Sequence, residues 1–322
     1  MTRADAVPSL SLPFDGGRFE PDAVVRDRAR AVRERLAAAA LEHFVQDDDV
    51  MVDLICRTSP LADADTIGPV AEWLLWVFPF DDLCEEVFAA DKPTDLLAGD
   101  ATGVAGRLVA TALPRAVAEG MTGFCRDVTA GRSPGWTTRF LRDLDTYVLH
   151  AIRYAGTSAE DDLPALEEFV VLRREEGAAK PTVDLVEVAA GVDLPEEFRN
   201  SPAWQRLRDS CADVLTWTND IYSHQKERHA GNRFNLVDVL VRHARLSEDG
   251  ARARAVDMTD EKAREFVVGA AELLHGNEFH SLDEGTRSDV LRCVRGMEHW
   301  MRGQYEWFVI TGPARYRVVP RG

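Results

Sequence analysis

The chain has 322 residues, of which 45% are apolar and 29% charged, and its formal net charge is −17 at pH 7. These proportions are those of a soluble globular protein and exclude a disordered or fibrous one. The negative charge argues against a nucleic-acid-binding protein, because binding to phosphate backbones requires clustered lysine and arginine side chains.

The N-terminal segment, MTRADAVPSLSLPFDGG, lacks a long apolar core, and no stretch approaches eighteen uncharged apolar residues. We therefore expect no membrane insertion and a cytoplasmic protein. The five cysteines are odd in number, widely scattered and without a CxxC pair. We expect them to be reduced core residues rather than disulfides or zinc ligands.

Helical periodicity runs through most of the chain, beginning with residues 23–44, where apolar residues recur three and four apart among Ala, Leu, Arg and Glu. The same pattern returns in residues 70–80, 137–155, 203–227 and 288–309. Alternating strand patterns and Asn-Gly hairpin signals are missing from the sequence. The breaks rich in Pro, Gly and Asp are too short to be interdomain linkers. The sequence predicts an all-α, single-domain bundle of about ten or more helices over residues 1–322.

Four carboxylates lie within six positions of residues 78–88, FPFDDLCEEVF. Residues four apart are neighbours on a helix, so two pairs of like charge lie close together and repel. The pairs are Asp81 with Glu85 and Asp82 with Glu86. The preceding turns, WLLWVF, are apolar almost all round, so we expect a buried helix. A buried carboxylate cluster indicates a metal such as Mg²⁺; the alternative is that Asp82 and Glu86 simply face water.

A second polar stripe lies in residues 218–228, TNDIYSHQKER. Asn219, Ser223 and Glu227 are four apart, so they advance by only about 40° per step and share one helix face. Amide, hydroxyl and carboxylate oxygens make a plausible single-metal site, and Lys226 beside them could bind a phosphate. Each residue alone is more commonly part of a solvated face. Two oxygen-rich stripes on two buried helices are harder to explain by solvation.

These two motifs resemble those of bacterial class I terpene synthases (terpene cyclases), and the resemblance covers the whole chain. In that family an aspartate-rich motif DDxx(x)(D/E), here DDLCEE, faces an NDxxSxxxE motif, here NDIYSHQKE, across a pocket in an all-α bundle. The second motif matches in full and is highly specific. The first is degenerate, and its last ligand is either Glu85 or Glu86.

The resemblance also implies residues that act on diphosphate. A sensor arginine lies forty-odd residues before the second motif, where this chain has Arg173. After the sensor comes a helix break, with Glu176 in the linker position and Gly177 as the residue whose carbonyl points at the substrate. An Arg-Tyr pair near the C-terminus is matched by Arg315 and Tyr316.

A Mg²⁺-dependent cyclase is the activity that the resemblance implies: it ionises a prenyl diphosphate, foremost farnesyl diphosphate, and cyclises the cation to a sesquiterpene hydrocarbon or alcohol. The resemblance also implies three Mg²⁺ ions, the number that this family binds. Their candidate ligands are Asp81, Asp82, Glu85, Glu86, Asn219, Ser223 and Glu227. Arg173, Lys226, Arg315 and Tyr316 would bind the diphosphate.

The hydrocarbon part of such a substrate needs a dry pocket with aromatic faces that attract positive charge. The candidate lining residues are Trp76, Phe78, Phe80, Trp217, Trp300, Trp307 and Phe308. Residues 1–20 are expected to form an N-terminal segment and residues 310–322 a C-terminal lid that closes over the mouth.

Several alternatives stay open at this point. A diterpene synthase would use geranylgeranyl diphosphate instead. A trans-prenyltransferase would need a second aspartate-rich motif where the NDxxSxxxE stripe stands, and a non-catalytic prenyl-binding helical protein would need neither that stripe nor Arg173. Arg174 and Arg317 neighbour the expected sensors and would more commonly form surface ion pairs. A homodimer is compatible with the sequence, which does not fix the oligomeric state.

Overall fold

The computed structural model describes residues 9–20, 22–44, 47–89, 103, 113–159 and 162–312. Within these residues it contains thirteen α-helices, one 3-10 helix and no strand, which confirms the all-α prediction. In chain order the helices are α1 (Ala23–Ala38), η2 (Glu42–Phe44), α2 (Asp48–Thr58), α3 (Ile67–Phe88), α6 (Arg115–Thr129), α7 (Pro134–Tyr154), α8 (Leu166–Glu176), α9 (Ala179–Ala189), α10 (Glu196–Arg199), α11 (Pro202–Ala230), α12 (Leu236–Ala244), α13 (Glu248–His275), α14 (Asn277–His280) and α15 (Glu284–Ile310).

The helix boundaries follow from capping residues in the sequence. Ser133 and Ser201 each precede a proline, and each serine oxygen accepts a hydrogen bond from the amide three residues on. Asp47 caps α2 in the same way, so Asp48 and Asp49 form the first turn of a helix. Gly231 ends α11 in the left-handed conformation, with φ of 91°, which costs a glycine little.

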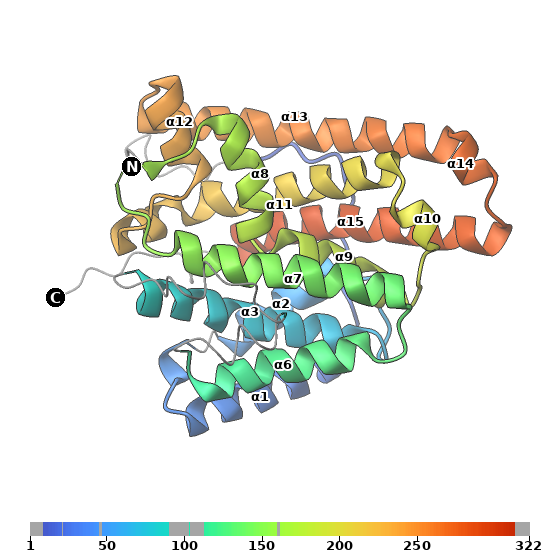
Figure 1. Ribbon diagram of the computed structural model, residues 1–322, viewed down its shortest axis with the longest axis horizontal. Helices are drawn as coiled ribbons and strands as arrows, with labels where there is room; N and C mark the ends of the chain where they lie inside the picture. The colour runs from blue at the N-terminus through green and yellow to red at the C-terminus, as the bar shows by residue number, and fades with distance from the viewer. Residues whose placement is uncertain are drawn as a thin grey trace.

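The long helices lie side by side along the long axis of the molecule (Figure 1). α11 packs against α13 and α15, α15 against α2, and α3 against α1 and α6. Their buried side chains form one continuous hydrophobic core. This packing holds α3, α11 and α15 around a common interior space, to which α8 and α9 also contribute residues.

Helix α3 is buried over most of its length and continues through Pro79 as far as Phe88. The four carboxylates of the first motif lie in the last two turns of this helix, after its apolar turns.

All five cysteines are free and buried, as predicted. In the parts of the chain that the structure describes, no helix combines the length and apolarity needed to cross a membrane.

Close contact between α15 and α2 depends on Gly303. A methyl group there would lie 2.4 Å from the backbone oxygen of Arg57, whereas one on Gly269, inside α13, would lie no closer than 3.7 Å to its nearest neighbour. We expect Gly303→Ala to lower the free energy of unfolding by roughly 1–3 kcal/mol. Gly269→Ala should raise it by about 0.4–1 kcal/mol. Denaturant titration measures both, and equal effects would contradict the proposed close packing.

Candidate functional site

A cavity of about 770 Å³ lies inside the bundle, and residues of both sequence motifs line it. Its apolar wall includes Leu54, Leu74, Val77, Leu215, Trp307 and Phe308. Its polar part includes Asp81, Asp82, Glu85, Glu86, Asn219 and Glu227. The structure therefore brings together side chains that are more than 130 positions apart in the sequence.

The aspartate-rich motif occupies the last turns of α3. Asp81 and Glu86 are exposed, and the other two carboxylates are partly buried. Asp82 accepts a hydrogen bond on Oδ1 from Nζ of Lys226, at 3.1 Å. This ion pair joins α3 to α11 across the cavity.

Glu85 is held by two neutral donors. Its Oε1 accepts from Nδ2 of Asn232 at 2.5 Å, and its Oε2 accepts from the backbone N–H of Gly156 at 3.0 Å. Burial raises the pKa of Glu85 to about 7, and the nearby charge of Asp81 adds to the rise. Because both oxygens have donors, Glu85 joins α3 to the turn that follows α7 and to the turn that follows α11.

Asn219, Ser223 and Glu227 lie along one side of α11, as the four-residue spacing predicts. Asn219 and Glu227 line the cavity, whereas Ser223 is 1% exposed and is not among the lining residues. Within the described chain the Ser223 hydroxyl oxygen has no hydrogen-bond partner. An unpaired buried hydroxyl costs roughly 1–3 kcal/mol. Such an orphaned oxygen beside two further oxygen donors fits a site that receives a cation.

Arg173 lies in the last turn of α8 and is only 6% exposed. It donates to Oδ1 of Asp220 from Nε at 2.9 Å and from Nη2 at 2.7 Å. Nη2 also reaches Oδ1 of Asn219 at 3.1 Å, and Nη1 pairs with Glu176. Burial opposes the charge, but the carboxylates of Asp220 and Glu176 outweigh it and hold the pKa of Arg173 well above its usual value. The guanidinium is thus fixed beside the second motif.

The break between α8 and α9 occurs where the sequence predicts it. Gly177 lines the cavity, and a methyl group on it would lie 2.6 Å from Cγ2 of Thr216, so the close approach of α11 requires glycine. Burial raises the pKa of Glu176 to about 8, although Arg173 opposes the rise. Burial likewise raises the pKa of Asp220 to about 6 against the same guanidinium.

The structure separates Arg173 from its neighbour Arg174. Arg174 points away from the motifs and pairs with Asp213 at 2.6 Å and with Asp209 at 3.1 Å. It is absent from the cavity lining in the described chain. The predicted pair Arg315 and Tyr316 lies outside the described residues.

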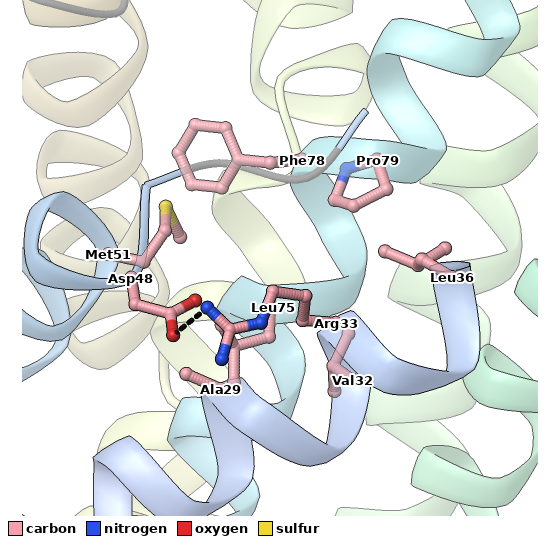
Figure 2. A pocket seen from close by; sticks show the side chains of 9 residues that line it. All are labelled: Ala29, Val32, Arg33, Leu36, Asp48, Met51, Leu75, Phe78 and Pro79. Carbon is pink, nitrogen blue, oxygen red and sulfur yellow. Dashed lines mark ion pairs between the residues drawn. The ribbon is translucent and has the colours of Figure 1, made fainter. Parts of the chain in front are cut away.

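Four of the seven predicted aromatic residues line the cavity: Phe78, Trp300, Trp307 and Phe308. Phe78 and Trp307 face each other with ring centroids 6.2 Å apart, and Trp307 meets Phe308 edge-on at 5.0 Å. Phe78 also closes one end of a hollow of about 20 Å³ between α1, α2 and α3, beside the Arg33–Asp48 ion pair (Figure 2).

The other three aromatic residues do not line the cavity, so the prediction that they do is wrong. Trp76 is fully buried on the side of α3 that packs against α1 and α6, next to Gly120, and its ring lies 4.9 Å from the guanidinium carbon of Arg35. Phe80 is buried and packs against Tyr147. Trp217 lies on the α13 side of α11, with its ring 5.9 Å from Nζ of Lys262. Each sits next to a lining position but on another face of its helix.

Sequence reasoning missed several polar residues of the cavity. Tyr147 and Gln304 line it, and in the described chain the Tyr147 hydroxyl and the Gln304 amide oxygen are buried without a hydrogen-bond partner. No motif marks either position. Asn232 follows the second motif by five residues. It lies in the segment GNRFN, whose glycine and asparagines are typical of a turn, and this composition is the only feature of the sequence that indicates the position.

The ligand set does not form a closed metal cage. Among the described residues, no three His, Cys, Asp or Glu side chains converge closely enough to hold an ion by themselves. Mg²⁺ does not require such a cage, because it keeps several waters and binds one or two carboxylates together with substrate phosphates. The oxygen donors on α3 and α11 fit that shared mode of binding.

Comparison with known proteins agrees with this geometry. Residues 72–265, more than half of the chain, match the model of terpene synthase family 2, C-terminal metal binding. The chain is 30% identical to (-)-delta-cadinene synthase of Streptomyces clavuligerus, over 82% of this chain and 80% of that protein. It is 27% identical to 4-epi-cubebol synthase ((2E,6E)-farnesyl diphosphate cyclizing) of Streptosporangium roseum, over 79% and 75%.

Solved structures show the same fold. Alpha-eudesmol synthase superposes with a TM-score of 0.75 at 26% identity, covering 95% of this chain and 100% of that one. Wild-type cucumene synthase superposes with a TM-score of 0.76 at 23% identity, covering 94% and 100%. With the family model and both motifs in agreement, the chain belongs to the class I terpene synthases.

Proposed function

We propose that the chain is a Mg²⁺-dependent sesquiterpene synthase that ionises farnesyl diphosphate and cyclises the resulting carbocation, with three Mg²⁺ ions between α3 and α11. One observation carries the proposal: two oxygen-rich motifs and a buried arginine meet at one cavity that also has a wall of aliphatic and aromatic side chains. A prenyl diphosphate has the same division between a charged head and a hydrocarbon tail. The cubebol relative, which is named as cyclising farnesyl diphosphate, supports this substrate.

The charged head would bind at the two motifs. Asp81 and Glu86 on α3, and the stripe of Asn219, Ser223 and Glu227 on α11, would hold the ions. Bound Mg²⁺ supplies positive charge that stabilises the diphosphate as the allylic C–O bond breaks. Arg173 and Lys226 add two cationic groups, and Asp220 and Asp82 hold these groups in place before substrate binds.

The hydrocarbon tail would lie against the apolar wall. Phe78, Trp307 and Phe308 present aromatic faces there, each worth about 0.5–2 kcal/mol to a nearby cation. The Gly177 carbonyl and the Glu176 linker are proposed to act near the reacting carbon, and Arg315 with Tyr316 to close the mouth. We also propose a cytoplasmic location, because five free buried cysteines are compatible with a reducing compartment.

Incubation of the purified protein with geranyl, farnesyl and geranylgeranyl diphosphates and Mg²⁺ tests the proposal. Gas chromatography and mass spectrometry should show a cyclic fifteen-carbon product from farnesyl diphosphate, and a chelator should abolish it because the leaving group loses its charge compensation. Cyclic product only from geranylgeranyl diphosphate would instead establish a diterpene synthase. Chain elongation, or no diphosphate release from any substrate, would contradict the proposal.

Replacing Ser223 separates a ligand from a structural hydroxyl. Ser223→Ala removes an unpaired buried oxygen, so the free energy of unfolding should stay equal or rise by about 1 kcal/mol. Turnover should fall about 100-fold if the hydroxyl binds an ion. Ser133→Ala is the matched control: it removes a helix cap, which should lower stability and spare turnover. Unchanged turnover in Ser223→Ala would remove this residue from the site.

Phe78→Leu should change the product mixture, because a smaller side chain opens the cavity toward the small hollow shown in Figure 2. Phe80→Leu is the matched control, since Phe80 is a buried phenylalanine two residues away that does not line the cavity. Product ratios by gas chromatography should shift for the first variant alone. A wild-type product ratio in Phe78→Leu, or the same change of ratio in both variants, would exclude Phe78 from the substrate wall.

A further inference from the structure

The turn between α11 and α12, residues 231–235, contacts both motifs of the site. It begins at Gly231, which ends α11, and it finishes at Asn235, the N-cap residue of α12. The two asparagines of this turn, Asn232 and Asn235, belong to neither motif. Asn232 nevertheless donates to Glu85 of the first motif, and Asn235 donates to Glu227 of the second.

Asn235 is fully buried. Its Oδ1 accepts from the backbone N–H of Val237 at 2.9 Å, which is the capping bond. Its Nδ2 donates to Oε2 of Glu227 at 2.9 Å and to the backbone oxygen of Asp220 at 3.0 Å. Capping needs only the oxygen, and serine or aspartate would supply one equally well. The amide nitrogen is therefore not required by the helix cap, and its partners belong to the second motif.

Asn232 likewise accepts one hydrogen bond through its side-chain oxygen and donates another through its side-chain nitrogen. Its Oδ1 accepts from the backbone N–H of Phe234 at 2.9 Å, and its Nδ2 donates to Oε1 of Glu85 at 2.5 Å. The next residue, Arg233, donates its backbone N–H to the carbonyl of Thr157 at 2.7 Å. The turn is thereby joined to the turn after α7, which binds the other oxygen of Glu85.

Leu236, the first residue of α12 directly after the turn, also holds the partner of Arg173. The backbone N–H of Leu236 donates to Oδ2 of Asp220 at 2.9 Å, while Oδ1 of Asp220 binds Arg173. Residues 232–236 thus contact Glu85 from α3, Glu227 from α11 and the carboxylate that orients Arg173 on α8.

We propose that Asn235 and Asn232 are positioning residues for the metal and diphosphate site: Asn235 fixes the rotamer of Glu227, and Asn232 fixes that of Glu85. The inference rests on the proposed function and deepens it. A carboxylate held by an amide donor has less side-chain freedom to lose when an ion arrives, and outer partners of this kind typically change metal affinity or activity by 10- to 100-fold. One turn then sets the position of carboxylates on both sides of the cavity.

Asn235→Ser tests the inference, because serine keeps the capping oxygen and loses the amide donor to Glu227. We expect the melting temperature without Mg²⁺ and diphosphate to fall slightly, because the buried carbonyl oxygen of Asp220 loses its donor. The Mg²⁺ concentration that gives half-maximal turnover should rise about 10- to 100-fold. The rise in melting temperature on adding Mg²⁺ with inorganic diphosphate should shrink. Asn232→Ser, which keeps an oxygen for the turn and loses the donor to Glu85, should act in the same direction.

Ser247→Ala is the control for capping, since it removes the N-cap oxygen of α13 and should leave the Mg²⁺ dependence unchanged. Wild-type Mg²⁺ dependence and a wild-type melting shift in both asparagine variants would overturn the inference. If Asn235→Ser does not fold, Asn232→Ser decides it. A wild-type chain that turns over no prenyl diphosphate would overturn the proposed function, and the melting shift with Mg²⁺ and diphosphate would still decide the role of the turn.

Discussion

Repulsion among carboxylates at the edge of an apolar cavity is the constraint on which the site depends. Four acidic residues of α3 and Glu227 of α11 line one cavity, and for the partly buried ones, Asp82, Glu85 and Glu227, an unpaired charge is more costly than it is in water. The fold meets that cost with groups from several other elements. Lys226 pairs with Asp82, neutral donors hold Glu85 and Glu227, and Arg173 is held by Asp220 beside the second motif. This network of ion pairs and hydrogen bonds stabilises the folded chain.

The buried carboxylates of the site affect both the stability of the chain and its proposed function. The raised pKa values of Glu85, Glu176 and Asp220 show that burial works against their ionised forms. Cations arriving between α3 and α11 would relieve this strain and bring diphosphate to the edge of the apolar wall. Ion binding, ionisation of the substrate and exclusion of water would then depend on one set of side chains. We expect the cavity wall beyond them, through Phe78 and the aromatic residues of α15, to control how the carbocation cyclises.

Sequence periodicity and motif spacing were sufficient for the all-α fold and for the oxygen stripe on α11, because a four-residue spacing fixes which side chains share a helix face. They were not sufficient for the aromatic wall. Trp76, Phe80 and Trp217 are apolar neighbours of lining positions, and only the rotation of each helix about its axis decides which ring faces the cavity. Gln304 and Tyr147 carry no motif at all. Asn232 and Asn235 act through a turn whose geometry depends on tertiary packing.

A crystal structure of the protein with Mg²⁺ and inorganic diphosphate would show whether α3 and α11 share one diphosphate. We expect diphosphate at the cavity mouth near Arg173, with ions held by Asp81 on one side and by Asn219, Ser223 and Glu227 on the other. Ions or diphosphate bound elsewhere, or side chains of α3 and α11 too far apart to share one diphosphate, would contradict the proposed arrangement.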